Sequence, residues 1–375
     1  MRIAPFDLER YFARHEFSTP HLLSVSDCEG LALAELLEMA DDETAALWQG
    51  LKLGYTDSQG HPLLRAEIAG LYQRIAPDQV LALTPEEGIF IAMNVLLRPG
   101  DHVVATFPGY QSLYEVAQAI GCQVTRWEPQ RLEGGWRFDL GQLRELVREE
   151  TRLLVVNFPH NPTGATLPRE EWLALVELAR ERGLWLFSDE MYRLLEYDVA
   201  DRLPSASDLY ERAIALSGLS KAFALAGLRL GWLTARDAAL MRELAAYKDY
   251  TTICHSAPSE VLGIIALRAR ERITARNLGI IRGNLRLAEE LFRAHADLFW
   301  WAAPRAGSVA FPALRQGSAQ ALCDGLRQER GVLLLPAGVF GYGDSHFRVG
   351  LGRRGMEQGF ALLQGYITDH IRGCA

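Results

Sequence analysis

The chain lacks an excess of positive charge and any long apolar run. Its 375 residues carry a formal net charge of −8, whereas proteins that bind nucleic acids or anionic membranes usually present a basic patch. The longest apolar stretches are too short and too interrupted to span a bilayer. The sequence therefore argues against a nucleic-acid partner and against a membrane partner. Any anion that the protein binds must meet arginines placed locally.

Cysteine is scarce, and no two cysteines form a CxxC pair. The cysteines are odd in number and widely spaced, at Cys28, Cys122, Cys254, Cys323 and Cys374. This usage is typical of free thiols in a reducing compartment. The start of the chain, MRIAPFDLERYFARHEF, has scattered charges and no apolar core followed by a cleavage site, so we read no signal peptide in it. We expect a cytoplasmic protein.

What the sequence does contain, from about residue 100, is an alternation of short apolar runs with amphipathic stretches. The apolar runs predict strands and the amphipathic stretches predict helices, with strands at 102–107, 152–158, 184–190 and 212–218 and helices at 110–121 and 168–183. The runs 153–156 and 184–187 are apolar throughout, as in parallel strands covered on both faces. Repeated strand–helix–strand units predict an α/β layered domain.

Two more helices help to divide the chain. LTPEEG predicts a helix that begins at Pro85, with Thr84 as its N-cap and Glu87 completing a capping box. After about residue 270 the pattern changes to a long helix (275–296) followed by short strands. This change indicates a separate, smaller α+β part.

Polar residues follow three of the predicted strands. NFPHNPTG places Asn161 after the strand at 152–158, SDEMY places Asp189 and Tyr192 at the end of the next, and SGLSK places Lys221 after the third. Because ligands of open parallel sheets bind outside the carboxyl ends of the strands, we expect these side chains to gather at one edge. Each alone also fits an ordinary role as a turn, a helix cap or a lysine extending to solvent.

In this order, NFPHNPTG, SDEMY, SKAFALAGLRLGW and FRVG resemble motifs of the class I/II aminotransferases, a large fold-type-I family of pyridoxal-phosphate enzymes. The resemblance implies an aspartate aminotransferase-like α/β fold, in which helices cover a mostly parallel seven-stranded sheet. It also implies a smaller α+β domain built from the C-terminal part and the N-terminal segment. We accordingly expect an N-terminal segment (1–44) that packs with the small domain, a large cofactor-binding domain (45–270) and a C-terminal small domain (271–375).

The resemblance implies a role for each strand-end residue toward pyridoxal 5′-phosphate. Lys221 matches the lysine that forms an imine, the internal aldimine, with the cofactor aldehyde and later moves a proton at the substrate's α-carbon. Its small and apolar neighbours suit an amine that must lose its proton to attack a carbonyl. Asp189 matches the carboxylate that keeps the pyridine nitrogen protonated. Asn161 and Tyr192 match two donors to the phenolic oxygen of the ring.

Four further positions match the family. Arg229 matches the arginine that binds the phosphate, and Tyr110 matches the aromatic side chain that stacks on the ring. Arg348 matches the arginine that takes the substrate's α-carboxylate as a two-pronged ion pair. Tyr55 matches a tyrosine that reaches the neighbouring subunit's phosphate, which implies a homodimer with shared active sites. From the residues alone, Tyr110 also fits core packing and Arg348 a salt bridge at a strand edge.

Two places depart from the family's phosphate-binding pattern. Where the family has a helix-start triplet such as G-A-T, this chain has TPE at 84–86; proline lacks an N–H, and a carboxylate repels a phosphate. Glu86 and Glu87 either favour only the helix dipole and point away from the cofactor, or Glu86 meets a cationic part of a ligand. The family's serine or threonine is replaced by Gly218, for which Ser217 and Ser220 are candidate substitutes.

Three functions follow from these patterns. The first is transfer of an amino group between an amino acid and a 2-oxo acid; Asp27 and Glu29, in the loop SVSDCEG, lie where a substrate side chain is expected, and we hypothesise that they select a polar or basic amino acid. The second is elimination and cyclisation of a basic amino acid derivative, because several stretches are also similar to capreomycidine synthase, a relative acting on an arginine derivative. The third is a non-catalytic ligand sensor, against which the negative charge and the intact chemical set argue.

Overall fold

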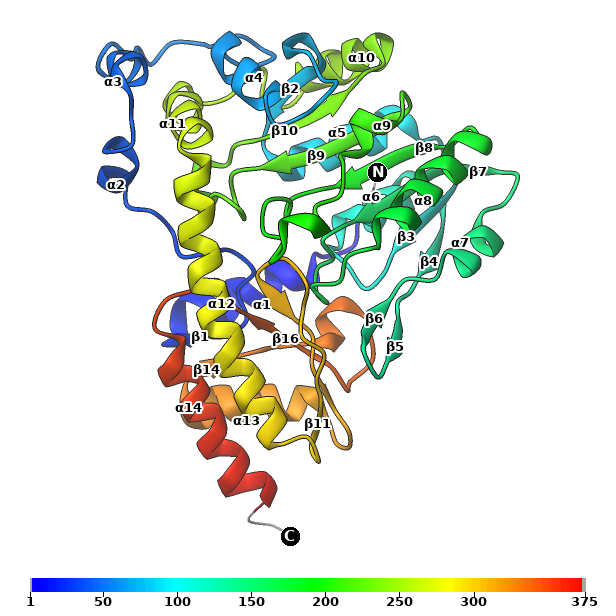
Figure 1. The fold of residues 1–375 in the computed structure, drawn as a ribbon. Helices are drawn as coiled ribbons and strands as arrows, with labels where there is room; N and C mark the ends of the chain where they lie inside the picture. The colour runs from blue at the N-terminus through cyan, green and yellow to red at the C-terminus, as the bar shows by residue number, and fades with distance from the viewer. Residues whose placement is uncertain (1, 373–375) are drawn as a thin grey trace.

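A seven-stranded mixed sheet forms the centre of the computed structural model, which describes residues 2–372 (Figure 1). In spatial order its strands are β2 (Val80–Leu83), β10 (Gly231–Ala235), β9 (Ala213–Gly218), β8 (Trp185–Asp189), β7 (Thr151–Asn157), β3 (His102–Thr106) and β4 (Gln123–Trp127). Strand β10 is antiparallel to both of its neighbours, and the pairs from β9 to β4 are parallel. The expected mostly parallel sheet of an aspartate aminotransferase-like α/β fold is confirmed.

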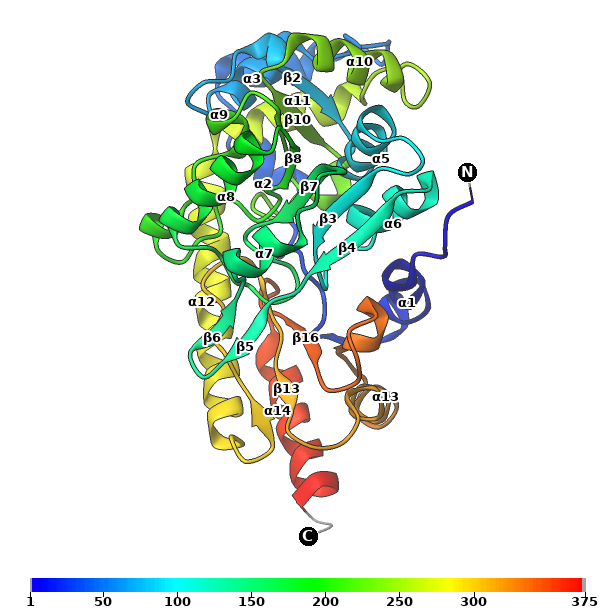
Figure 2. The ribbon, with the colours of Figure 1, turned by 90° about the vertical axis from the view of Figure 1, so that its right-hand side faces the viewer.

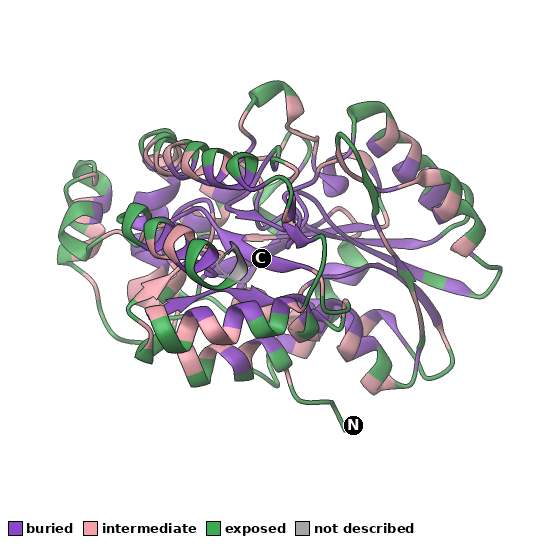
Figure 3. Cartoon of the chain, turned by 90° about the horizontal axis from the view of Figure 1, so that it is seen from below, coloured by how far each residue is buried: buried purple, intermediate pink, exposed green. Residues whose placement is uncertain are grey.

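Helices cover both faces of this sheet, as the continuous apolar runs predicted. Successive residues of β7 alternate between two cores: Leu153 and Val155 pack in one, Leu154 and Val156 in the other. The first core is shared with α4 (Pro62–Ala69), α5 (Pro85–Leu96), α6 (Ser112–Ile120), α10 (Ala238–Lys248) and α11 (Ala257–Arg268), and the second with α7 (Leu140–Leu146), α8 (Arg169–Glu181) and α9 (Ala206–Leu209). Each such side chain contributes about 1.5–3 kcal/mol through burial. In Figure 3 the strands are accordingly buried, while the outer faces of the helices are exposed.

The long helix α12 (Arg270–Ala294) leads from the sheet region into a smaller α+β part. This part contains α13 (Ala319–Arg330), α14 (Met356–Tyr366), β11 (Phe299–Trp300) paired with β13 (Ala313–Leu314), and a sheet of β12 (Val309–Ala310), β16 (Phe347–Gly350) and β15 (Leu335–Pro336). A hairpin of β5 (Gln130–Leu132) and β6 (Gly135–Arg137) extends from the large part. We propose that the two domains meet where α12 begins, near residue 270.

The N-terminal segment joins the smaller part although it is far away in sequence. Strand β1 (His21–Leu22) pairs in parallel with β14 (Val332–Leu333). Helix α1 (Asp7–His15) packs Leu8 and Tyr11 against apolar side chains around Phe340. Figure 2 shows α1 between this part and the edge of the large sheet. The segment continues through α2 (Leu33–Leu37) and α3 (Asp42–Gln49).

The helices and the cysteines bear on the expectations about membrane spans and free thiols. Across residues 2–372, none of the helices has the length and apolar character needed to cross a bilayer. Four cysteines are free thiols, at Cys28, Cys122, Cys254 and Cys323. Cys374 lies outside the described residues.

Candidate active site

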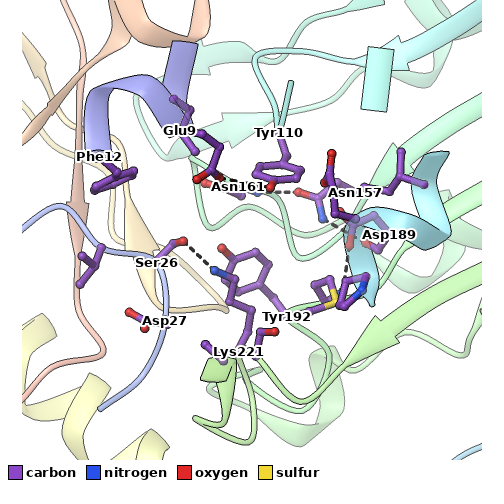
Figure 4. A pocket seen from close by; sticks show the side chains of 18 of the residues that line it. Glu9, Phe12, Ser26, Asp27, Tyr110, Asn157, Asn161, Asp189, Tyr192 and Lys221 are labelled. Atoms are coloured by element: carbon purple, nitrogen blue, oxygen red, sulfur yellow. Dashed lines mark hydrogen bonds between the residues drawn. The ribbon is translucent and has the colours of Figure 1, made fainter. Parts of the chain in front are cut away.

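Both parts of the chain line one cavity of about 390 Å³ at the carboxyl ends of β7, β8 and β9 (Figure 4). Large-domain positions Asn161, Asp189, Tyr192 and Lys221 all contribute to its wall, as do Ser220, Arg229, Tyr110 and Glu86. Arg348 enters from β16, and Asp27 enters from the N-terminal segment. The structure thus brings most of the predicted site residues together.

Lys221 lies in the loop that follows β9, half-buried among fully buried apolar neighbours such as Leu219 and Ala222. Its Nζ donates a hydrogen bond to Ser26 Oγ at 2.9 Å and lies 5.9 Å from the centre of the Tyr192 ring. No carboxylate of the described chain forms an ion pair with it. The amine therefore faces the cavity, with a neutral hydroxyl as its hydrogen-bond partner.

Asp189 is the last residue of β8 and is only 5% exposed. Strand register places it beside Asn157, whose Nδ2 donates to the Asp189 carbonyl at 3.0 Å. The Asp189 carboxylate accepts a 3.0 Å hydrogen bond from the Met191 N–H. Burial raises the pKa of this carboxyl to about 7, while the Met191 hydrogen bond and nearby Lys221 act in the opposite direction. At neutral pH such a carboxyl is only partly ionised, and an approaching cation would favour its ionised form.

Arg348 is 1% exposed and has no carboxylate partner within residues 2–372. Its Nε and Nη2 donate to the Ser24 carbonyl at 3.0 and 2.9 Å, and its Nη1 donates to Asn161 Oδ1 at 3.1 Å. Burial lowers its pKa to about 10, so it remains a cation at neutral pH. A buried guanidinium held only by neutral acceptors is suited to bind a carboxylate ligand.

Other cavity side chains are also available to a ligand. The Tyr192 hydroxyl is buried and has no hydrogen-bond partner in the described chain. Tyr110 packs its ring 4.9 Å from that of Phe6. Arg229 adopts a left-handed backbone conformation (φ 53°), and its side chain is exposed toward the cavity. Ser220 is buried in the same wall.

One face of α1 and its continuation forms a wall that sequence reasoning missed. Leu8, Glu9, Phe12 and Glu16 all line the cavity. Tyr110 donates a 3.3 Å hydrogen bond to the Glu9 carboxylate. The Glu16 carboxylate is half-buried, and no donor in residues 2–372 hydrogen-bonds to it. Its pKa is raised, first by burial and then by neighbouring Asp27.

The two acidic residues predicted for the N-terminal loop have different positions. Asp27 lines the cavity and forms an ion pair with Arg353 (Nη2–Oδ2 2.7 Å). Glu29 does not line the cavity, and its carboxylate accepts a hydrogen bond from the Arg354 N–H at 3.1 Å. Only Asp27 is placed to meet a ligand within this chain.

The start of α5 separates Glu86 from Glu87. Glu86 lines the cavity, accepts a 3.1 Å hydrogen bond from Ser112, and has its pKa raised by burial. Glu87 is outside this cavity; it accepts from the Thr84 N–H at 3.2 Å, as in the predicted capping box, and from Thr252 at 2.7 Å. The expectation that both carboxylates point away therefore describes Glu87 and does not describe Glu86.

Both departures from the phosphate-binding pattern meet at Pro85. A Cβ added at Gly218 would lie 3.2 Å from Pro85 Cγ, and one added at Gly231 would lie 2.6 Å from it. The proline ring thus occupies the space that a larger residue at 218 would need. Tyr55, the residue predicted to act on a neighbouring subunit, is 90% exposed and outside the cavity of its own chain.

Sequence reasoning also missed Ser26 and Asn157. Ser26 is the acceptor for Lys221, and Asn157 supports both Asp189 and the Asn161 N–H, which donates to Asn157 Oδ1 at 2.8 Å. A signal for Asn157 was present, because a polar residue ends an otherwise apolar strand. No local signal distinguishes Ser26 from the other serines of its loop.

Comparisons with known proteins agree with this geometry. The family "Aminotransferase class I and II" matches residues 21–357. Capreomycidine synthase of Streptomyces vinaceus is 34% identical over 84% of this chain and 81% of its own length. The arginine–pyruvate transaminase of Pseudomonas aeruginosa is 30% identical over 88% of this chain and 85% of its own.

A solved structure supports the same assignment. A PLP-dependent aminotransferase from Streptococcus suis superposes with a TM-score of 0.91 and 30% identity, over 98% of this chain and 99% of that one. Agreement at this level extends through both domains. On the family match and these relatives, the chain belongs to the class I and II aminotransferases, which are pyridoxal-phosphate-dependent enzymes.

Proposed function

We propose that this enzyme transfers the amino group of an amino acid with a cationic side chain to a 2-oxo acid, with pyridoxal 5′-phosphate bound at Lys221. One observation carries the proposal. A single cavity contains the Lys221 amine, the buried Asp189 carboxylate, the unpartnered Tyr192 hydroxyl and the buried Arg348 guanidinium. Each of these groups needs a complementary group that the described chain does not supply.

The side chains present fit the cofactor. Asp189 is a buried carboxylate without an ion-pair partner and fits the pyridine nitrogen. The unpartnered Tyr192 hydroxyl and the Asn161 amide fit the phenolic oxygen, and Arg229 fits the phosphate. We assign Ser220 to the phosphate and Tyr110 to the ring face as well. When bound, the cofactor supplies an electron sink that stabilises negative charge at the substrate's α-carbon.

In this scheme Lys221 is the proton carrier. Once the substrate's amino group has displaced it from the cofactor, the amine, held near Ser26, would take the proton from the α-carbon and pass it to the cofactor, and it would carry a proton in the reverse direction when the 2-oxo acid is aminated. Positioned acid–base catalysis of this kind accelerates a step by about 10²–10⁴-fold. The Ser26 contact keeps the flexible Lys221 side chain directed into the cavity. This restriction lowers the entropy cost of bringing the amine to the reactive atom.

Arg348 orients the substrate. The Ser24 carbonyl and Asn161 amide fix the plane of the guanidinium, so a carboxylate approaching it finds a preset geometry. We assign it the α-carboxylate of both the amino acid and the 2-oxo acid. Because the group is buried, water competes poorly for it once substrate is bound.

The side chain of the amino donor is expected to be cationic. Glu16 and Asp27 both face the cavity from the N-terminal side, and Glu9 lies on the same helix face as Glu16. Of these three, only Asp27 forms an ion pair with an arginine. An amine or guanidinium on the substrate would neutralise the negative charge of these carboxylates. The 30% identity to an arginine–pyruvate transaminase supports the same substrate class.

We also propose a homodimer that works in the cytoplasm. Tyr55 is almost fully exposed although it is large and aromatic, which fits a residue that completes the site of a second copy. The free cysteines fit a reducing compartment. Sedimentation of the purified protein would test the dimer, and a monomer at micromolar concentration that retains full activity would reject it.

The decisive experiment combines cofactor capture with a donor panel. Purified protein incubated with pyridoxal 5′-phosphate is expected to become yellow, and borohydride is expected to fix the cofactor to Lys221, as read by peptide mapping. In single turnovers, arginine, ornithine and lysine should release a 2-oxo acid and leave pyridoxamine phosphate, with aspartate and leucine slower. A colourless protein would reject the enzyme assignment, and faster turnover of aspartate or leucine would reject only the cationic donor.

A second candidate function is elimination and cyclisation of a basic amino acid derivative. It is favoured by the 34% identity to capreomycidine synthase over most of both chains. The same Lys221, Asp189 and Arg348 arrangement serves both outcomes, because each begins with loss of the α-proton. The two are separated by the fate of the nitrogen: a transaminase leaves pyridoxamine phosphate, whereas a cyclase returns the original cofactor and an amino acid product.

A further inference from the structure

Lys248, at the end of α10, is a fully buried cation that the proposed chemistry does not use. It is one of three lysines in the chain, with Lys52 and Lys221. Lys248 is only 1% exposed. Its Nζ donates hydrogen bonds to the Ser58 carbonyl at 3.0 Å and to the Ile253 carbonyl at 2.9 Å. No carboxylate in the described part of the chain forms an ion pair with it. Removing an ammonium group from water costs free energy, and here only carbonyl oxygens replace the water. The contacts that Lys248 makes therefore require an explanation.

The contacts of Lys248 fix the α10–α11 loop, residues 249–256, which touches two parts of the cofactor site. His255 Nε2 donates to the Arg229 carbonyl at 3.0 Å. Thr252 Oγ1 donates to Glu87 Oε1 at 2.7 Å, at the first turn of α5. The loop therefore supports the backbone of the proposed phosphate-binding arginine and the start of the helix beside it.

The same loop also holds the segment 54–61, which carries Tyr55. Several hydrogen bonds connect this segment to the region around α10 and α11, among them Thr56 Oγ1 to the His255 carbonyl (3.1 Å), Lys248 Nζ to the Ser58 carbonyl (3.0 Å), and the His61 N–H to Glu260 Oε2 (3.3 Å). Lys248 joins the segment and the loop through a single atom. The position of Tyr55 thus depends on the same ammonium as the position of the loop.

Two strained residues show that these contacts determine local conformation. Arg229 (φ 53°) and Ile253 (φ 65°) both have left-handed backbones, which are unfavourable for residues other than glycine and most of all for a β-branched one. The carbonyl of each is an acceptor in this network, Arg229 from His255 and Ile253 from Lys248. Such conformations persist only where surrounding contacts impose them.

The two segments joined by Lys248 also present large apolar side chains to solvent. Tyr55, Tyr250 and Ile253 are 90%, 91% and 51% exposed, and Leu53, directly before segment 54–61, is 85% exposed. Scattered single apolar residues need no explanation, but four in or next to two adjoining segments fit a contact surface. Under the proposed homodimer the occupant is a second copy of this chain, into whose site Tyr55 extends.

We propose that Lys248 is a positioning residue for the phosphate end of the cofactor site, acting on two active sites at once. Through the α10–α11 loop it sets Arg229 in its own chain, and through segment 54–61 it sets Tyr55 for the partner subunit. This inference rests on the proposed cofactor site and homodimer. It assigns Lys248 no contact with substrate, so its effect falls on cofactor affinity and leaves substrate binding unchanged.

The test is the cofactor dissociation constant of Lys248→Met, which keeps the aliphatic volume and removes the ammonium. Cofactor-free protein is titrated with pyridoxal phosphate and followed by tryptophan fluorescence. We expect affinity to fall by about tenfold or more, as for loss of charged hydrogen bonds, with the KM for the amino donor within about twofold at saturating cofactor. Lys52→Met, at an exposed lysine of the same region, is the matched control and should match wild type.

Several outcomes would overturn the inference. If Lys248→Met binds the cofactor as tightly as wild type, or raises the KM and the cofactor constant in the same proportion, Lys248 is not a positioning residue for the phosphate end. If wild-type protein itself fails to bind the cofactor, the proposed function fails with it. Should Lys248→Met not fold, Thr56→Val decides: loss of its side-chain hydrogen bonds to the His255 carbonyl and to Glu260 should weaken cofactor binding roughly threefold, and no change would reject the proposal.

The two-site action has its own measurement. Hybrid dimers of wild-type and Lys248→Met chains are isolated with two different affinity tags and titrated with pyridoxal phosphate. We expect both sites to bind more weakly than in wild type, because one loses its own Arg229 support and the other loses the Tyr55 support of its partner. A hybrid in which one site keeps wild-type affinity would show that Lys248 does not affect the site of the partner subunit.

Discussion

The side-chain nitrogen of Lys221 donates a 2.9 Å hydrogen bond to the hydroxyl of Ser26, which lies 195 residues earlier in the chain. The Ser26 carbonyl in turn accepts a 2.6 Å hydrogen bond from Ser308 in the small domain. Lys221, which follows a strand of the central sheet, is thus tied to an N-terminal loop that Ser308 also holds. Because Asp27 and the wall of α1 adjoin this loop, one side of the cavity is built from the N-terminal segment.

Ser26→Ala tests what this hydrogen bond contributes. Loss of one hydrogen bond amounts to about 0.5–1.5 kcal/mol, so we expect kcat to fall roughly three- to tenfold with an unchanged cofactor dissociation constant. Steady-state kinetics and cofactor titration measure the two effects. Ser18→Ala, at an exposed serine, is the control. A loss above about a hundredfold would contradict a purely orienting role and place Ser26 in the proton transfer itself.

Arg348→Met should separate substrate binding from cofactor binding. The variant loses a buried cation that has no anionic partner in the described chain, so the folded protein is expected to tolerate it. Without it, the KM for every amino donor should rise by about a hundredfold, as for a lost buried charge pair of about 2–5 kcal/mol. The cofactor dissociation constant should change by much less than the KM. Arg354→Met is the exposed control, and an unchanged KM for Arg348→Met would move the carboxylate site elsewhere.

Glu16→Gln tests the cationic donor. The carboxylate has no hydrogen-bond donor in residues 2–372 and faces the cavity, so removing its charge should cost little stability. We expect kcat/KM for a basic donor to fall about ten- to a hundredfold, since a charged hydrogen bond contributes about 1.5–3 kcal/mol. A neutral donor should change by less than about twofold. Glu38→Gln is the exposed control, and equal losses for basic and neutral donors would show that Glu16 does not select charge.

Asp189 makes the stability of the cofactor-free protein depend on pH. Burial raises its pKa from 3.8 to about 7, so between these values the folded protein holds a proton that the unfolded chain has released. Its contribution therefore falls as pH rises from about 4 to about 7 and stays constant above that. Asp189→Asn keeps an acceptor for the Met191 N–H and removes this effect.

At pH 8, cofactor-free Asp189→Asn should accordingly be more stable than wild type, on the order of 2–4 kcal/mol, and at pH 5 the difference should shrink. Urea unfolding at the two pH values measures this. The same variant should bind pyridoxal phosphate at least about tenfold more weakly, because the pyridine nitrogen loses its anion. Equal stability of both proteins at both pH values would show that the carboxyl carries no such penalty.

Strands buried on both faces were predictable, and others were not. In β7, Leu153 to Val156 are all apolar because helices cover both sides, so the run is recognisable without any periodicity. Edge strand β4 includes exposed Gln123 and Arg126, and its pattern resembles a loop. Strand β10 runs antiparallel directly after the Arg229 loop, so it breaks the strand–helix alternation on which the prediction depended.

The residues that line the cavity also divide into predictable and unpredictable ones. The positions of Asn161, Asp189 and Lys221 were predictable because each lies at or shortly after the end of a recognisable strand, and strand ends of a parallel sheet share an edge. The α1 wall was not predictable. The amphipathic sequence DLERYFARH shows that one face of the helix is covered, but it does not show what covers that face. The contact of Glu9 with Tyr110 joins residues 101 positions apart, and only the folded chain brings them together.

Gly218→Ser tests whether the two departures at the phosphate end form one packing unit. The family's hydroxyl would be restored, but its Cβ would lie 3.0 Å from Gly231 Cα, 3.1 Å from the Leu230 carbonyl oxygen and 3.2 Å from Pro85 Cγ. We expect the variant to lose about 1–3 kcal/mol of unfolding free energy through overpacking. Adding Pro85→Ala opens space on one side, so the double variant should be more stable than the sum of the single effects predicts, by at least about 0.5 kcal/mol. Urea unfolding of the four proteins gives this coupling. Strict additivity would mean that glycine at 218 and proline at 85 are independent, and that the missing hydroxyl has another cause.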